Sequence, residues 1–276
     1  MNDNPMNGNP MNGARWLRWA GSGSGSGDGN GNGDGLRLFC FPHAGAGPAQ
    51  FVGWADGMGP DIDVAGVCLP GREQRINESP IRRMDPLVAR LATEIGPYLR
   101  PPYALFGHSL GAQVAFALAH HMERLGRGPA HLFVSSARAP HVPSGEPPAH
   151  TLDDESLLAH TRALDGLPAE VLAQRDLIQL TLPALRADFE LSETYRPEPT
   201  TTVRCPITAL GGAHDRSVPV AALRCWKDLT TGPYGVIELP GGHFYLIEHE
   251  RHVVRLIRSR LAATHPSDLS SEEVSP

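Results

Sequence analysis

The chain has 276 residues, of which 41% are hydrophobic, so it is long enough to bury one sizeable core. Its formal net charge of -6 argues against a nucleic-acid binder, because neutralising phosphates requires a basic surface. No apolar run approaches the length of a membrane span, so we expect a soluble protein that binds neither nucleic acid nor membrane.

The cysteines point to a reducing compartment. There are four of them, Cys40, Cys68, Cys205 and Cys225, and no two form a Cys-x-x-Cys pair. A cysteine within an apolar run usually behaves as a small buried hydrophobe. We therefore expect no zinc site, no disulfide framework and a cytoplasmic location.

The N-terminal residues 1–35 are rich in Asn, Gly and Ser. Such a composition buries too little apolar surface to offset chain entropy, so we predict a flexible tail. Trp16 and Trp19 are the exceptions within it, and an exposed patch is favoured over docking on a partner. Residues 265–276 are predicted to be a second disordered tail.

Between the tails, strand-like and helix-like segments alternate. The predicted strands are 36–41, 62–69, 103–106, 131–136, 206–210 and 236–239, and the predicted helices are 49–58, 85–99, 112–125 and 249–263. This alternation predicts an α/β fold with a mostly parallel sheet covered on both faces.

One interval breaks the alternation. Residues 140–204 contain no convincing strand, only helical patterning over 153–164, 169–180 and 183–195. Insertions after a late strand of an α/β sheet commonly cover the site at the strand ends. We therefore predict a helical lid.

The pentapeptide Gly-His-Ser-Leu-Gly at 107–111 stands between the strand 103–106 and the helix 112–125. A sharp strand-to-helix turn crowds its flanks, and glycines there let Ser109 adopt strained angles with its Oγ exposed. The motif predicts a nucleophile elbow. The alternative is a turn serine that caps a helix.

A serine nucleophile requires a base, itself oriented by a third group. In this architecture the order along the chain is serine, acid, histidine. His243 is the predicted base among thirteen histidines, because its loop follows the strand 236–239. The alternative is a structural histidine bonded to a loop carbonyl.

The acid is predicted from the same order. Asp215 is the only carboxylate in the loop 211–215, which follows the strand 206–210. Its expected role is to hold the His243 tautomer and stabilise the imidazolium. An Asx-turn or helix-capping aspartate is the alternative.

An oxyanion requires preorganised amides. We expect one from Leu110, directly after the serine, and the second from Ala44 in the small-residue loop 42–47 after the first ordered strand.

Together these residues resemble the α/β-hydrolase superfamily, and more narrowly the type II thioesterases that accompany modular polyketide and nonribosomal peptide synthases. The resemblance rests on the blocks Phe41-Pro42-His43-Ala44-Gly45, Leu69-Pro70-Gly71-Arg72-Glu73, Gly107 to Ala112, Leu185 to Phe189 with Tyr195-Arg196-Pro197, and Gly242 to Leu246. It implies a thioesterase domain over 36–264 with the lid at about 140–204.

The resemblance also implies the activity. That family hydrolyses acyl groups from the phosphopantetheine arm of acyl or peptidyl carrier proteins, through an acyl-enzyme, and so clears stalled or misprimed synthases. The arm belongs to the substrate, so no cofactor and no metal are expected on this chain. We expect a monomer that contacts carrier proteins transiently.

Two positions depart from the pattern. Ala46 stands where the family often has a second glycine, and Arg216 where proline often follows the acid. Both changes concern the geometry of a loop, and neither removes a catalytic group.

Carrier proteins are typically acidic, so docking on an acidic chain requires a local basic surface. The candidates are Arg72, Arg75, Arg82 and Arg83, ahead of the helix that begins near residue 85. A solvated charged face, or internal pairing of these arginines, is the alternative.

Two other functions remain open from sequence. A carboxylesterase or lipase-like hydrolase would use the same triad, and a non-catalytic interaction module would share the scaffold. The intact order of Ser109, Asp215 and His243 argues against the second.

Overall fold

The computed structural model describes residues 15–21, 35–164 and 174–264, and its centre is a seven-stranded sheet. The strands are β1 (Leu17–Trp19), β2 (Leu36–Phe41), β3 (Ile62–Val67), β4 (Tyr103–His108), β5 (His131–Ser135), β6 (Ile207–Gly212) and β7 (Tyr234–Leu239). Their order is β1-β3-β2-β4-β5-β6-β7. Only the β1–β3 pair is antiparallel.

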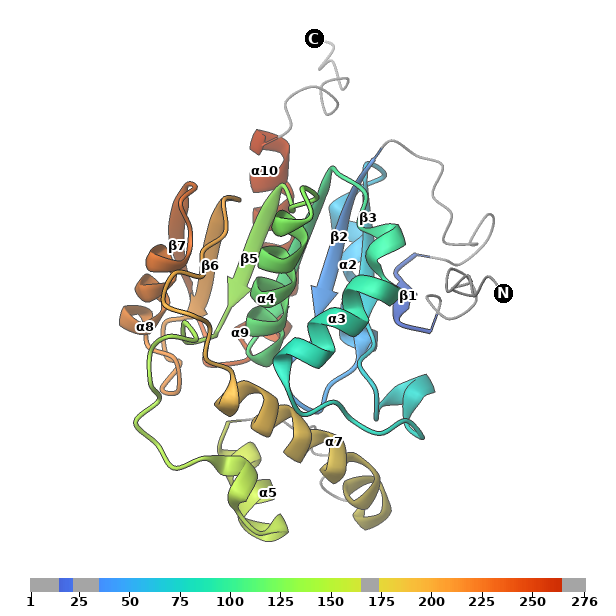
Figure 1. Cartoon of the computed structure of the whole chain (residues 1–276), viewed down its shortest axis with the longest axis vertical. Coiled ribbons are helices and arrows are strands. Elements are labelled where there is room, and N and C mark those ends of the chain that lie inside the picture. The colour runs from blue at the N-terminus through green and yellow to red at the C-terminus, as the bar shows by residue number, and fades with distance from the viewer. Residues whose placement is uncertain (1–14, 22–34, 165–173, 265–276) are drawn as a thin grey trace, which may run out of the picture.

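Helices cover both faces of this sheet (Figure 1). The described helices are η1 (Pro48–Phe51), α2 (Trp54–Met58), η2 (Glu73–Arg75), α3 (Met84–Glu94), η3 (Gly96–Tyr98), α4 (Leu110–Arg124), η4 (Ala149–Thr151), α5 (Asp154–Ala163), α7 (Arg175–Thr194), α8 (Val220–Arg224), η5 (Cys225–Leu229), α9 (Tyr245–Glu248) and α10 (Glu250–Thr264). α3 and α4 pack on one face, whereas α2 and α10 pack on the other.

Strand β2 shows why its sequence is apolar at every position except Arg37. Phe39 and Phe41 pack into the core beneath α3 and α4, whereas Leu38 and Cys40 pack into the core beneath α2 and α10. Alternate side chains therefore enter two different cores, and a strand covered on both faces has no polar side. This arrangement confirms the predicted α/β fold with a mostly parallel sheet.

The helices η4, α5 and α7, which we call the helical insertion, lie between β5 and β6 in the chain. In Figure 1 they lie beyond the arrowheads of the parallel strands. Ala149, Leu157, Leu182 and Leu185 form a small core of their own, against which Ala44 packs.

The predicted helices 169–180 and 183–195 differ from the structure. Residues 175–194 form one helix, α7, that continues through Pro183, and residues 169–173 lie outside the described residues. Proline removes one main-chain donor. The Pro183 ring is exposed, so water can reach the carbonyl that loses this donor.

The prediction of a flexible tail over residues 1–35 is wrong in part. Residues 17–19 form β1, paired with β3 at the edge of the sheet, and Trp16 is only 2% exposed. The Arg75 guanidinium carbon lies 3.6 Å from the centroid of the Trp16 ring, and the Cys68 N–H donates to the Trp16 carbonyl at 2.8 Å. The otherwise open edge of β3 orders this short segment. Residues 1–14, 22–34 and 265–276 lie outside the described residues.

His131 is a buried titratable group within this sheet. Its Nε2 lies 2.8 Å from Thr208 Oγ1, and its ring stacks on Phe133. Burial, aided by the charge of Arg260, lowers the pKa of His131 from the ordinary 6.5 to about 4. The imidazole is therefore neutral in the folded protein at neutral pH.

We predict that His131→Gln flattens the dependence of stability on acid pH. The unfolded chain binds this proton near pH 6.5, but the folded protein binds it only near pH 4, so the free energy of unfolding falls as pH drops through that interval. At 1.36 kcal/mol per pKa unit, the free energy of unfolding falls by up to about 3 kcal/mol over this interval. Urea unfolding between pH 7 and pH 4 measures it. The exposed His252→Gln is the control, and equal slopes in wild type and His131→Gln would contradict the prediction.

Candidate active site

The strand-to-helix turn at Ser109 is built by close backbone contacts. Ser109 has φ 56° and ψ -120°, a conformation that is rare for a residue with a side chain. A Cβ on Gly107 would lie 2.1 Å from the Gly111 carbonyl oxygen, and a Cβ on Gly111 would lie 2.1 Å from the Phe41 carbonyl oxygen. Both glycines are therefore required by space, as the motif predicts.

Asp215 and His243 meet in the structure. His243 Nδ1 lies 2.8 Å from Asp215 Oδ2, while Asp215 Oδ1 accepts from the amides of Ser217 and Val218 at 2.9 and 3.0 Å. Burial opposes the charge on Asp215, but the His243 hydrogen bond and charge, with the two amides, hold the pKa of Asp215 below its ordinary value. An ionised Asp215 fixes a proton on Nδ1 and leaves Nε2 free to accept another.

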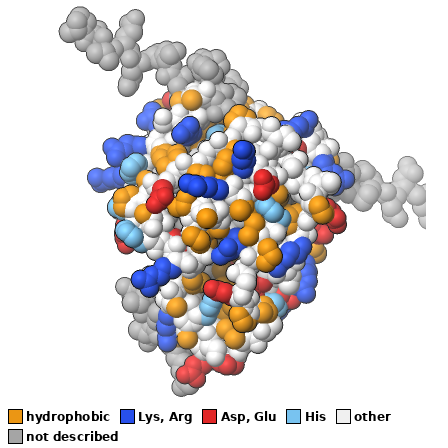
Figure 2. All heavy atoms as spheres, turned by 90° about the vertical axis from the view of Figure 1, so that its left-hand side faces the viewer, with side chains coloured by type: hydrophobic (Ala, Val, Ile, Leu, Met, Phe, Trp, Pro, Cys, Tyr) orange, Lys and Arg blue, Asp and Glu red, His pale blue; other side chains and the backbone are white. Residues whose placement is uncertain are grey.

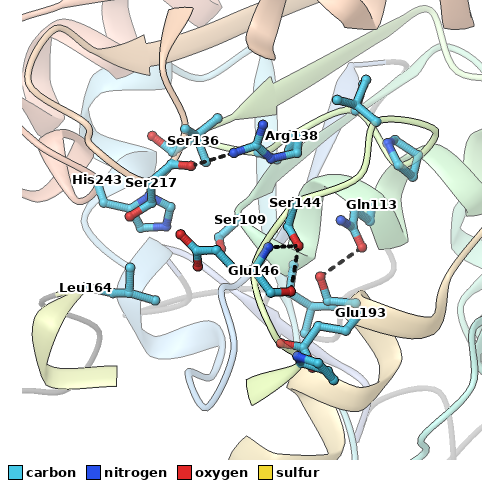
Figure 3. Close-up of a pocket in the computed structure, with 18 of the residues that line it drawn as sticks. Ser109, Gln113, Ser136, Arg138, Ser144, Glu146, Leu164, Glu193, Ser217 and His243 are labelled. Atoms are coloured by element: carbon cyan, nitrogen blue, oxygen red, sulfur yellow. Dashed lines mark hydrogen bonds between the residues drawn. The ribbon is translucent and has the colours of Figure 1, made fainter. Parts of the chain in front are cut away.

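A cavity of about 440 Å³ brings Ser109 and His243 together (Figure 3). Its walls are mixed in polarity. Sequence reasoning did not single out Gln113, Arg138, Glu146, Ser192 or Glu193, which line it. These residues carry no motif, and the fold alone brings them together.

A second, smaller cavity of about 60 Å³ shares part of its lining with the first. Ser109, Leu110, Ala44 and His243 line it, together with a largely apolar set. That set includes Leu164, Leu185, Phe189 and Phe244. Ser109 therefore lines both a larger cavity of mixed polarity and a smaller, largely apolar one.

The predicted oxyanion residues are both at this site. Leu110 begins α4 directly after Ser109, and Ala44 lies in the loop after β2. In that loop the Ala46 N–H donates to the His43 carbonyl at 3.1 Å, and Gly45 has φ +77°. These are the marks of a tight turn with glycine at its third position, as in a type II turn.

A chain of buried, hydrogen-bonded polar side chains lies next to His243. His108 Nδ1 lies 2.9 Å from Ser135 Oγ, which lies 2.7 Å from the Tyr245 hydroxyl. The His108 ring lies 5.3 Å from that of His243. Burial, with the neighbouring imidazoles, lowers the pKa of His108 well below its ordinary value, so His108 stays neutral beside His243. Sequence analysis did not assign Ser135 or Tyr245.

The predicted basic docking surface is partly wrong. Arg72 and Arg75 are buried, because Arg72 forms a two-pronged ion pair with Asp188 and Arg75 pairs with Glu78 beneath Trp16. Neither can meet a partner protein.

Arg82 and Arg83 are half exposed, as that prediction requires, and both pair with Glu190 of α7. On the face seen in Figure 2, the described basic, acidic and histidine side chains are interspersed with hydrophobic ones.

Two findings concern other kinds of site. Across residues 15–21, 35–164 and 174–264, no cluster of three or more His, Cys, Asp or Glu side chains could hold a metal ion. Within the same ranges, no helix combines the length and apolar character that crossing a membrane requires.

A parallel sheet with a serine at a strained elbow, and a histidine–aspartate pair on the loops after β6 and β7, defines an α/β hydrolase. Residues 36–261 match the model of the thioesterase domain family. The chain belongs to that family and is a thioester hydrolase, which confirms the resemblance seen in the sequence.

Individual relatives agree with this assignment. The gramicidin S biosynthesis protein GrsT of Aneurinibacillus migulanus is 37% identical over 227 residues, which cover 82% of this chain and 89% of that protein. The thioesterase PikA5 of Streptomyces venezuelae is 35% identical over 231 residues, covering 83% and 82%. The structure of the type II thioesterase BorB from the borrelidin biosynthetic cluster superposes with a TM-score of 0.79 at 36% identity, covering 90% of this chain and 98% of BorB.

We predict that Gly111→Ala abolishes hydrolysis and lowers the free energy of unfolding by at least about 3 kcal/mol. The new methyl would overlap the Phe41 carbonyl, which belongs to the central sheet and cannot move cheaply. Urea unfolding and a thioester hydrolysis assay measure the two effects. Gly235→Ala in β7 is the control, because a Cβ there meets nothing within 4 Å. A stable, active Gly111→Ala would show that the elbow is not tightly packed.

Proposed function

We propose that Ser109, His243 and Asp215 form a catalytic triad that hydrolyses acyl thioesters carried on the phosphopantetheine arm of carrier proteins. The observation that carries the proposal is the 2.8 Å contact between His243 Nδ1 and Asp215, with His243 lining the same cavity as Ser109. The kinship with thioesterases of peptide and polyketide pathways supports the carrier-bound substrate. The role is the removal of stalled or wrong acyl groups from a synthase.

The proposed chemistry has two halves. His243 Nε2 takes the hydroxyl proton as Ser109 Oγ attacks the thioester carbonyl, and the oxyanion is held by the amides of Leu110 and Ala44. The C–S bond then breaks and leaves an acyl-Ser109 ester. Because a thiol has a pKa near 8.5, it departs readily as thiolate, with less need of acid assistance than an alkoxide. The His243 imidazolium then gives its proton to the departing sulfur, which leaves His243 neutral for the second half.

Water completes the cycle. His243 removes a proton from water, whose oxygen attacks the acyl ester, and the same amides hold the second oxyanion. The C–O bond to Ser109 then breaks, His243 returns the proton to Ser109 Oγ, and the acid leaves. These steps use side chains, amides and water, so we propose that the protein requires no cofactor of its own.

The two cavities suggest how the substrate is divided. We propose that the apolar cavity beside Leu185 and Phe189 receives the acyl group, while the larger cavity, whose walls are mixed in polarity, receives the pantetheine arm. The arm carries amide groups that need hydrogen-bonding partners, which that cavity offers. The helical insertion supplies walls to both cavities, and we propose that it acts as a lid.

Location and assembly follow from the same proposal. The four cysteines are free, as expected in a reducing cytoplasm, where we place the protein. One chain supplies every proposed catalytic group, so we propose that the monomer is active.

The decisive test of the triad is Ser109→Ala, which we expect to lower kcat for an acyl-pantetheine thioester by at least about 10⁴-fold. Ser259→Ala is the matched control, because Ser259 is exposed on α10 and lines neither cavity. Each enzyme is assayed on a thioester and on the oxygen ester of the same acyl group. Activity retained in Ser109→Ala would refute the triad, and a preference for the oxygen ester would identify a carboxylesterase.

Carrier docking is proposed for the surface around Arg82 and Arg83, since carrier proteins are typically acidic. Arg83 borders a groove of about 750 Å³ that also contains Arg124 and Arg196, together with Asp85 and Glu198. Arg196 lines the catalytic cavity as well, so the groove leads toward Ser109.

We predict opposite effects from two changes at this surface. The double change Arg82→Glu/Arg83→Glu should raise KM for an acyl carrier protein several-fold, whereas Glu190→Gln should lower it by releasing both arginines from their internal partner. KM for a small acyl-pantetheine should stay constant in both. Equal changes on the two substrates would rule out docking at this surface.

A further inference from the structure

Asp188 is a buried carboxylate that joins the helical insertion to the loop holding Ala44. It lies on α7 and is 2% exposed. Its Oδ2 accepts the Gly45 N–H at 2.8 Å and Arg72 Nη1 at 2.7 Å, while its Oδ1 accepts Arg72 Nη2 at 2.9 Å. Three donors from two separate loops therefore converge on one side chain.

Arg72 completes the network from the loop after β3. Besides Asp188, it donates to the carbonyls of Pro70 and Ala46, both at 3.2 Å. Although burial disfavours its charge, the Asp188 carboxylate keeps the pKa of Arg72 above its ordinary value. Arg72 thus binds both the Asp188 carboxylate and the carbonyl of Ala46, the last residue of the turn at 43–46.

Stability alone does not account for this ion pair. Burying two charges costs several kcal/mol each, and a well-packed apolar pair of similar volume is often as stable. The Arg72 Nε is moreover buried without a hydrogen-bond partner among the described residues. An arrangement that leaves a buried donor unsatisfied is not optimised for stability alone.

The turn geometry shows what the network fixes. The Ala46 N–H bonds to the His43 carbonyl, whose peptide plane also carries the Ala44 N–H on the opposite side. Asp188 holds the central peptide of the turn through Gly45, and Arg72 holds its end through Ala46. Leu185, one helical turn before Asp188 on α7, lies against Gly45, where a Cβ would approach its Cδ1 to 3.1 Å. Three side chains, from Asp188, Arg72 and Leu185, therefore hold this turn.

We propose that Asp188 is a positioning residue for the oxyanion hole, with Arg72 holding its carboxylate toward Gly45. The inference rests on the proposed role of the Ala44 amide. It assigns to α7 a task beyond covering the site, because the same helix sets the position of an amide that stabilises the transition state. Loss of Asp188 should therefore affect the tetrahedral oxyanion more than the bound substrate.

The first test is Asp188→Asn in the full-length protein, assayed on a small acyl-pantetheine thioester. We expect kcat to fall about 10²-fold while KM changes little, since one displaced oxyanion donor costs that much. Binding of an acyl trifluoromethyl ketone, which forms a tetrahedral adduct with the serine, should weaken about as much as kcat/KM falls. Binding of a thioether analogue, which has no carbonyl to become an oxyanion, should not. Asp154→Asn is the matched control, because it removes an ion pair with Arg186 in the same insertion without touching the turn.

The second test separates positioning from stability. The double variant Arg72→Met/Asp188→Leu removes both charges, so it should recover the stability lost in Asp188→Asn. Its kcat should stay low, because the Asp188→Leu change leaves the Gly45 N–H without a side-chain acceptor. Recovery of kcat with stability, or equal weakening of the ketone and the thioether, would overturn the inference. These outcomes differ from failure of the triad, which Ser109→Ala reports independently.

Discussion

The close approach of two backbones at the elbow is the constraint on which the site depends. Gly111 allows the first turn of α4 to lie against the Phe41 carbonyl at the end of β2, and Gly107 allows β4 to end against that same turn. Strands β2 and β4 are neighbours in register, so this packing fixes the start of the Ala44 loop relative to Ser109. Ser109 and the loop that holds Ala44 are therefore parts of one packed unit.

The histidine and the acid are brought together by a second close approach. Strands β6 and β7 pair along their full length, and their loops leave the sheet side by side. A Cβ on Gly212 would lie 2.2 Å from the Gly242 carbonyl, and the His214 N–H donates to the Gly241 carbonyl at 2.9 Å. Two loops this tightly joined leave Asp215 and His243 little freedom to separate. Preorganisation of this kind lowers the reorganisation that the reaction requires.

The sequence predicted well those features that depend on local patterns. The elbow is marked by the spacing of its glycines, and the strands are marked by apolar runs. The acid and the histidine are indicated by their order along the chain. It predicted poorly the features that depend on distant contacts. Arg72 reads as a surface charge, because its partner Asp188 lies 116 residues further along the chain. Likewise Trp16 reads as part of a flexible tail, since only the open edge of β3 and the Arg75 guanidinium give it a buried place.

The buried ion pair of Arg72 with Asp188 gives the helical insertion a proposed role beyond covering the site. A cover that merely shields a site from water needs only apolar contacts with it, such as those of Leu185 and Phe189. Helix α7 adds a charged contact to that cover, because Asp188 faces the Gly45 amide. A displacement of α7 away from the turn at 43–46 would carry this carboxylate away from the Gly45 amide. Under the proposals above, access to Ser109 and stabilisation of its oxyanion are therefore properties of one helix, and the transition state is held best when the substrate is enclosed.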